Sequence, residues 1–198
     1  MSIGSTPPAD LVSQAPAGQS LRFFTPHEAR TVEAVMGRIM PDDELGPGAV
    51  EAGTVSYADH TLAGVEQGNQ TRYRAGVKLL DAACRARFGH AFADCGHVEQ
   101  DAMVGDMAAG SVPPVTGAAE DLDWAVAFFE LLREHTLEGM FSDPVHGGNR
   151  DLAGWKLLGY LGPQPGYSHE EQQLDAVVVR DRIFTAADYP LEQAGERP

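Results

Sequence analysis

The stretch from Trp124 to Tyr160 constrains the fold of this chain more than any other segment. Its first half carries large side chains at three- and four-residue spacings, which line up on one face of a helix. These positions are Trp124, Phe128, Leu131, Leu132 and His135. Pro144 and the pair Gly147–Gly148 then end the helix, because proline disfavours a helical residue before it and glycine adopts conformations that other residues avoid. A second helix follows, with Asn149 or Asp151 as its N-cap, so the stretch predicts two helices joined by a tight polar turn.

Four further helices are predicted upstream. Thr25-Pro26-His27-Glu28 is typical of a helix start with a capping box, and this helix ends before Pro41. A shorter helix is expected over Val50–Val65, a long one from Asn69 to Phe88 with Gly89 as its stop, and another over His97–Ala109. The positions expected to face inward are Val32, Val35, Met36, Ile39, Val55, Tyr57, Leu62, Tyr73, Val77, Leu80, Cys84, Phe88, Val98, Met103, Val104 and Met107.

These elements predict an all-α fold, a single compact domain of about six helices. The 198 residues suffice for one substantial core but not for two. We expect a flexible N-terminal arm over residues 1–20, the helical domain over residues 21–168, and a polar C-terminal tail over residues 169–198. Gly110–Gly117 is typical of a linker and is a candidate hinge, and the tail contains one apolar run, Ala176–Val179.

Composition excludes several classes of function. The net charge of −15 argues against nucleic acid or an anionic membrane surface as partner, since both are bound through basic patches. No apolar run approaches the roughly 20 residues of a membrane-spanning helix, so direct membrane insertion is not expected. Residues 1–20 contain neither an apolar leader core nor a twin arginine, so we expect a cytoplasmic protein, or a periplasmic one if a leader was removed or a partner carries the chain.

The sequence lacks the common cofactor motifs. It contains no Gly-x-Gly-x-x-Gly, phosphate-binding loop, Gly-x-Ser-x-Gly or Cys-x-x-Cys-His. Cys84 and Cys95 are the only cysteines, and with His90 and His97 they match no common zinc spacing, so buried thiols are the favoured interpretation. A disulfide between Cys84 and Cys95 would form only in an oxidising compartment.

His135 has three interpretations. It lies in phase with Trp124 on the apolar face, which favours a core histidine hydrogen-bonded to a carbonyl or to a carboxylate such as Asp143. Alternatively, it is a polar group held at a contact with another protein or pointing into a partner's active site. The third interpretation joins it with Glu138, Asp143 and His146 in a metal site, since two imidazoles and two carboxylates suit iron or zinc.

The polar turn is either a plain helix connection or a binding surface. Phe141, Trp155 and Tyr160 bracket it, and aromatic side chains around a rigid polar turn are typical of protein-binding hot spots. A core packed with aromatic side chains is the competing interpretation.

The same residues carry a resemblance to a known family. The run Glu-His-Thr-x-Glu-Gly-x-Phe-Ser-Asp-Pro-x-His-Gly-Gly-Asn over residues 134–149, followed by Gly154-Trp155-Lys156 and Gly159-Tyr160, resembles the gluconate 2-dehydrogenase subunit 3 family. Weaker similarity extends upstream to Phe24–Glu28 and Pro47–Gly53, so the resemblance covers about residues 21–168.

The resemblance implies a small, non-catalytic subunit without a cofactor of its own. Such subunits accompany a larger FAD-containing flavoprotein of the glucose–methanol–choline type, which oxidises sugars, sugar acids or glycosides, and some complexes add a c-type cytochrome. The small subunit is associated with maturation, stability and sometimes export of its partner. This chain departs from the family in lacking a visible twin-arginine leader, and in having His146 where relatives often have Tyr and Leu161 where they often have Pro.

Three hypotheses follow. The chain is a helical small subunit that binds and matures a large FAD-dependent sugar or glycoside oxidoreductase, a free-standing helical metalloenzyme using His135, Glu138, Asp143 and His146, or a generic helical chaperone. Under the first hypothesis no catalytic, cofactor-binding or metal-binding residue lies on this chain. The residues expected to bind the partner are His135, Phe141, Asp143, His146, Asn149, Trp155 and Tyr160.

Overall fold

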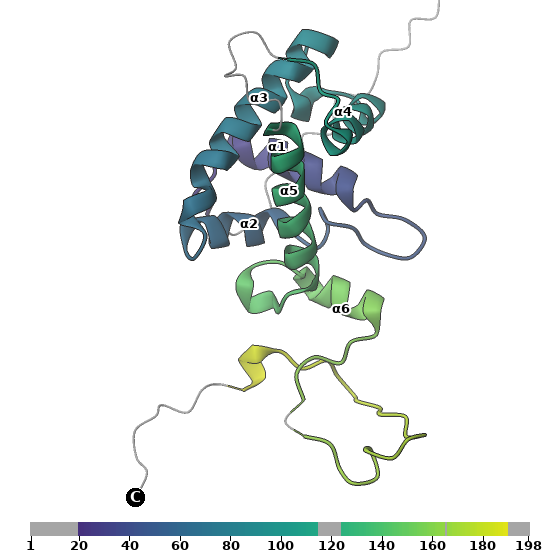
Figure 1. The fold of residues 1–198 in the computed structure, drawn as a ribbon. Helices are drawn as coiled ribbons and strands as arrows, with labels where there is room; N and C mark the ends of the chain where they lie inside the picture. Colours follow the sequence, from purple (N-terminus) through teal and green to yellow (C-terminus); the bar gives the residue numbers. More distant parts are fainter. Residues whose placement is uncertain (1–19, 115–123, 165, 190–198) are drawn as a thin grey trace, which may run out of the picture.

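The regular secondary structure in the described part of the chain consists of helices. The computed structural model describes residues 20–114, 124–164 and 166–189. Its α-helices are α1 Pro26–Ile39, α2 Thr54–Ala63, α3 Gln70–Phe88, α4 His97–Ala109, α5 Trp124–Phe141 and α6 Ala153–Leu158 (Figure 1). Short 3₁₀ turns occur at Gln67–Asn69, Phe92–Asp94, Pro144–His146, Arg150–Leu152 and Ala186–Asp188. Apart from an isolated bridge between Asp43 and Gly46, these residues form no strand, which confirms the all-α prediction with six helices.

α5 is the central element of the helical body. It packs against α1, α2, α3 and α4, and Figure 1 shows it running through the middle of the bundle toward α6. The apolar faces of these helices meet in one continuous core, whose removal from water is the main force that stabilises the fold. The largest fully buried side chains include Tyr73, Phe92, Met36, Leu62, Leu80, Met103, Met107, Leu132 and Met140. None of the described helices is long and apolar enough to cross a membrane.

The local signals predicted at helix ends are confirmed. The backbone amide of Glu28 donates to Thr25 Oγ1 (3.3 Å), and the backbone amide of Thr25 donates to the Glu28 carboxylate (2.8 Å), which completes the capping box of α1. Gly89 closes α3 with a φ of 87°, a left-handed conformation that glycine adopts without strain. α4 spans His97–Ala109 as predicted.

The second helix is shorter than the predicted range Val50–Val65. α2 begins at Thr54, because the residue before it, Gly53, has a left-handed φ of 69° that does not continue a helix. At the other end, Gly64 terminates the helix after Ala63. The two valines at the predicted limits are exposed in consequence.

A few side chains predicted to face inward lie at the edge of the core or outside it. Val98 is 83% exposed, because α4 buries the face that contacts α1 and α5, where Met103, Val104 and Met107 lie. Half-buried positions from the predicted set are Ile39, Tyr57, Phe88 and Trp124.

A buried carboxylate fixes the chain at its entry into α1. Asp59 of α2 is 1% exposed and accepts the backbone amides of Arg22 (2.6 Å), Phe23 (3.0 Å) and Phe24 (2.8 Å). Burial of an ionised carboxylate is unfavourable unless hydrogen bonds replace its lost water, and three charge-assisted bonds do so here. The segment before α1 is therefore tied to α2.

α6 lies beyond the end of α5. Its Ala153 packs with Ala52 and Met140 in a second, smaller apolar cluster. After α6 the chain continues to residue 189 without a further α-helix, and Figure 1 shows this part extending away from the helical body. The predicted N-terminal arm, apart from residue 20, lies outside the described residues. The same holds for residues 115–117 of the predicted hinge and residues 190–198 of the tail.

Candidate functional site

The polar turn between α5 and α6 is shaped by a cap and by close backbone contacts. We call residues 142–152 the α5–α6 turn. Asp143 accepts the backbone amide of Val145 (3.0 Å) and so caps the 3₁₀ turn Pro144–His146. Gly148 approaches α5 so closely that a Cβ at this position would lie 2.1 Å from the carbonyl oxygen of Gly139. Only glycine fits there, so the turn lies directly on the last turns of α5.

Asn149 joins the two helices through its buried side chain. Its Nδ2 donates to the carbonyl oxygen of Ser142 (2.9 Å), and its Oδ1 accepts the backbone amide of Gly154 (2.9 Å). Asn149 therefore satisfies one of the first amides of α6, as the sequence predicts for Asn149 or Asp151, although Leu152 holds the N-cap position. Asp151 is exposed.

Trp155 strengthens the same connection from α6. Its indole Nε1 donates to the carbonyl oxygen of Phe141 at 2.7 Å, where α5 ends. Its ring meets the ring of Tyr160 edge to face, with 5.0 Å between the centroids. The side chain of Trp155 is 4% exposed, so it supports the turn from inside.

The residues predicted to bind a partner fall into three groups in the structure. His135, Asn149 and Trp155 are buried, Phe141 and Asp143 are partly buried, and His146 and Tyr160 are exposed. The sequence reasoning missed Val145 and Leu158, which are exposed apolar side chains of the turn and of α6. Contact with a partner stays a prediction for all of these residues, and the buried His135, Asn149 and Trp155 cannot make it without rearrangement.

His135 lies at the centre of a buried hydrogen-bond chain. Its Nδ1 is 2.7 Å from the Tyr73 hydroxyl, and its Nε2 is 2.9 Å from a carboxylate oxygen of Glu66. An ionised carboxylate only accepts, so Nε2 carries the hydrogen, and in a neutral imidazole Nδ1 then accepts from the Tyr73 hydroxyl. The core-histidine interpretation is confirmed. Its carboxylate partner, however, is Glu66, because the Asp143 carboxylate instead accepts the backbone amides of Val145 and Ala186.

The two groups that flank His135 have pKa values shifted away from neutral pH. Burial raises the pKa of Tyr73 well above its usual value, and the nearby carboxylates of Glu66 and Glu138 add to the shift. Burial would also raise the pKa of Glu66, but hydrogen bonds from Asn69 and His135 outweigh it and hold that pKa below its usual value. Tyr73 therefore stays protonated and Glu66 stays ionised near neutral pH. Since Tyr73 is fully buried, no substrate can reach its hydroxyl.

A second hydrogen bond brings Glu138 close to His135. The Tyr57 hydroxyl donates to the Glu138 carboxylate (3.0 Å), and burial together with this carboxylate raises the pKa of Tyr57 to about 12. Glu66, His135 and Glu138 each offer a ligand atom, and these atoms lie within 4.8 Å of one another.

This cluster differs from the predicted metal site. Among the described residues it keeps His135 and Glu138 but has Glu66 in place of Asp143 and His146. Ligand atoms on a four-coordinate zinc ion lie about 3.4 Å apart, whereas His135 Nε2 and the Glu66 carboxylate are already in direct hydrogen-bond contact at 2.9 Å, so a metal ion would have to break this bond. Each of them already has a hydrogen-bond partner. The geometry favours a structural network over a preformed metal site.

The cysteines also have a structural role. Cys84 and Cys95 are free and buried. Burial raises the pKa of the Cys84 thiol to about 12, and the neighbouring thiol of Cys95 adds to the shift. The zinc arrangement with His90 and His97 is not among the ligand clusters of the described residues. The interpretation as buried thiols is confirmed.

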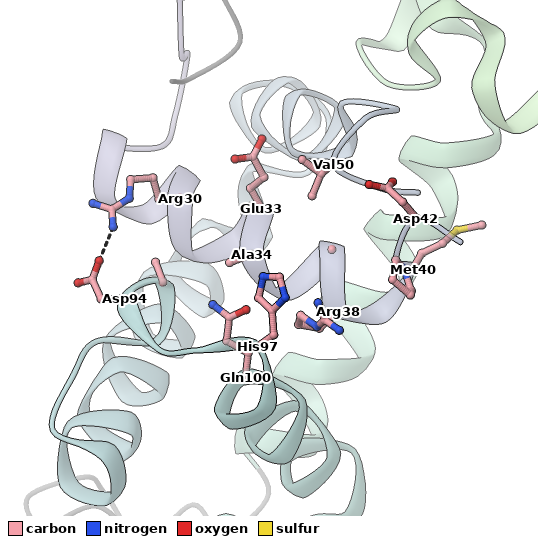
Figure 2. Close-up of a pocket in the computed structure, with 13 residues that line it drawn as sticks. Arg30, Glu33, Ala34, Arg38, Met40, Asp42, Val50, Asp94, His97 and Gln100 are labelled. Atoms are coloured by element: carbon pink, nitrogen blue, oxygen red, sulfur yellow. Dashed lines mark hydrogen bonds and ion pairs between the residues drawn. The ribbon is translucent and has the colours of Figure 1, made fainter. Parts of the chain in front are cut away.

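An open groove of about 890 Å³ lies between α1 and the start of α4. Figure 2 shows Glu33, Ala34 and Arg38 of α1 on one side of it and His97 of α4 on the other. The guanidinium of Arg30 pairs with Asp94 across it (2.5 Å). Within the described residues the lining includes no serine, cysteine or lysine, so it offers none of these nucleophiles. This groove was not predictable from local sequence patterns, since its walls come from separate segments without a shared motif.

Comparison with known families identifies the class of this protein. A family model described as gluconate 2-dehydrogenase subunit 3 matches residues 26–162, which extend from the start of α1 to just beyond α6. The chain therefore belongs to the gluconate 2-dehydrogenase subunit 3 family. No curated protein and no solved structure matches the chain.

Proposed function

We propose that this chain is the accessory small subunit of an FAD-dependent sugar or glycoside oxidoreductase, and that it binds the large subunit through the α5–α6 turn. Membership of a family named for a dehydrogenase subunit carries this proposal. The flavin and the catalytic residues would lie on the large subunit, of the glucose–methanol–choline type, and a c-type cytochrome would be a further component in some complexes. The small subunit would stabilise and mature its partner.

The geometry of the α5–α6 turn supports a docking role. Val145, His146 and Tyr160 are exposed on a segment whose backbone is fixed by Asn149 and Trp155. A rigid surface loses little conformational entropy when it binds, and exposed aromatic and aliphatic side chains are the usual anchors of a protein interface. The polar side chains around His135 are instead buried or half-buried and paired with one another, which fits a subunit without catalysis of its own.

Co-expression with a glucose–methanol–choline-type flavoprotein, sought among the neighbouring genes, tests the proposal. The chain alone should be colourless, and the two chains together should yield a complex with flavin absorbance. The substitutions Val145→Asp and Tyr160→Asp should each weaken association about tenfold or more, because each places a charge in an apolar contact. Val98→Asp in α4 is the matched control, since Val98 is also exposed and Figure 1 shows α4 at the other end of the bundle from α6.

Two results would sink the proposal. The first is a well-folded chain that shows no association with the flavoprotein and no effect on its flavin content. The second is equal rescue of unrelated flavoproteins, which would favour the generic chaperone.

The Glu66–His135–Glu138 cluster supports a second candidate, a free-standing metalloenzyme. Elemental analysis of the purified chain decides between the two. Stoichiometric iron, zinc or manganese that is lost in His135→Ala would favour the metalloenzyme, and a metal content far below one ion per chain rejects it.

A further inference from the structure

The part of the chain after α6 exposes apolar side chains that have no packing role in the described structure. We call residues 166–183 the arm. Leu174 is 100% exposed, Val177 is 85% exposed and Val179 is 76% exposed. Single exposed aliphatic residues are ordinary on protein surfaces, but three within six positions form a concentrated apolar segment. Such a segment is favourable in water only when another surface covers it.

The arm begins and ends at the same place on the helical body, just after α6. The backbone amide of Phe184 donates to the carbonyl oxygen of Leu161 (3.1 Å), which closes the loop just after α6. Gly162, with a φ of 80°, lies so close to this point that a Cβ would be 1.8 Å from the carbonyl oxygen of Phe184. The backbone amide of Ala186 then donates to the Asp143 carboxylate (2.7 Å), so the base of the arm is joined to the α5–α6 turn.

Polar contacts hold the arm in shape while its aliphatic side chains stay in water. Arg180 pairs with Glu171, donates to the Gln164 side chain (2.8 Å), and lies over the ring of Tyr167. Loops of this length without secondary structure of their own are uncommon in compact domains and usually either have a function or are linkers. The arm is therefore a projection joined by polar contacts whose apolar residues are available for binding.

The arm also lies outside the part of the chain that defines the family. The family model ends at residue 162, at the base of the arm. We propose that the arm binds the large catalytic subunit and extends the docking surface of the α5–α6 turn. This inference rests on the proposed function, since it takes the same partner. The large subunit is the occupant because the base of the arm is bonded to Asp143, beside the exposed Val145 of that surface.

The charges of the arm describe the surface that it fits. Exposed acidic residues flank the aliphatic ones in sequence: Glu170, Asp175 and Asp181. An apolar patch with a basic rim on the large subunit would match both features. Specificity for one large subunit would then come from the arm as well as from the turn.

The test compares full-length variants in binding to the co-expressed and purified large subunit. Leu174→Asp, Val177→Asp and Val179→Asp are combined in one variant, and Val98→Asp is the matched control. Because the three side chains make no core contact, the variant should keep the helical circular dichroism and melting temperature of the wild type. Its affinity for the large subunit should fall by about 100-fold or more, because each aliphatic side chain buried in the contact contributes about tenfold and at least two are buried. The affinity of the control should stay within about threefold of the wild type.

The outcomes separate the two proposals. If the wild-type chain does not bind the large subunit, the proposed function fails. If the wild type binds and the triple variant binds within about threefold of it, only the role of the arm fails. Hydrogen exchange gives a second readout, since the amides of residues 174–179 should become protected in the complex, and unchanged exchange there would overturn the inference. A wild-type chain that dimerises alone through an arm-dependent contact, seen by light scattering, would also overturn it.

Discussion

Replacement of Asn149 by alanine should detach the α5–α6 turn from α6. The substitution removes both side-chain hydrogen bonds of a residue that is fully buried. It leaves the part-buried carbonyl of Ser142 and the buried amide of Gly154 without partners, at a cost of about 1 and about 2 kcal/mol. Alanine must also adopt the φ of 47° that Asn149 has, which costs about 1 kcal/mol more. The expected loss is about 4 kcal/mol, a large part of the stability of an ordinary domain.

Two further variants divide this loss into its parts. Asn149→Gly removes the same hydrogen bonds but accepts the positive φ without strain, so it should be about 1 kcal/mol less damaging than the alanine variant. Asp151→Ala is the matched control, because Asp151 also has a positive φ of 55° but is exposed and makes no side-chain hydrogen bond within the described structure. It should cost about 1 kcal/mol or less.

Urea unfolding and amide hydrogen exchange should be measured together. α6 packs in its own small cluster, so the damage can appear as local opening of α6 before the whole domain unfolds. In Asn149→Ala the amide of Gly154 should exchange several hundredfold faster or more, or the unfolding free energy should fall by the full amount. If Asn149→Ala matches Asp151→Ala in both readouts, Asn149 does not hold the two helices together.

Three other predictions concern the buried polar groups. Tyr73→Phe should lower the unfolding free energy by about 1–3 kcal/mol in thermal or urea denaturation, because it leaves Nδ1 of His135 without a donor, and an unchanged stability would contradict the hydrogen-bond chain. The pKa of Glu66 is lowered in the folded state. Its contribution to stability is therefore fully present above its usual pKa near 4.5 and is lost as the pH falls through the lower folded value. Glu66→Gln should flatten this part of the stability–pH curve, and an unaltered curve would refute the assignment of the Glu66 hydrogen bonds. With a thiol pKa of about 12, roughly one Cys84 in ten thousand is ionised at pH 8. Iodoacetamide should therefore alkylate Cys84 in urea but not in the folded chain. Rapid alkylation of the folded chain, detected by mass spectrometry, would disprove the burial of Cys84.

Features set by neighbouring residues were predictable from the sequence. The capping box of α1, the glycine stop of α3 and the limits of α4 depend on side chains within one or two helical turns. The buried face of α5 followed from spacing in the same way, because helical periodicity fixes which side chains share a face.

Features that depend on distant segments were not predictable. Glu66 pairs with His135 from 69 positions away, and no spacing rule links the two. The aromatic side chain of Trp155 suggested an anchor on the surface. In the structure it is buried and hydrogen-bonded to a carbonyl of α5, which no local pattern around Trp155 indicates. Val98 lies on a helix with apolar residues on more than one side, and only the positions of α1 and α5 decide which side is buried. The return of the tail to Gly162 has no local signal, because one backbone hydrogen bond and a close approach define it.

The closure of the arm has a consequence for how such a protein can change. Its two ends meet through main-chain groups and the carboxylate of Asp143, and at Gly162 the fit requires the absence of a side chain. A junction of this kind does not depend on the aliphatic side chains of the loop that it closes, although Arg180 and Arg182 bond to Gln164 and Asp188 beside it. The aliphatic part of the arm should therefore accept exchange or redesign without unfolding the helical body, as long as the junction residues, Arg180 and Arg182 remain. The helical body can in this respect stay the same while the arm changes.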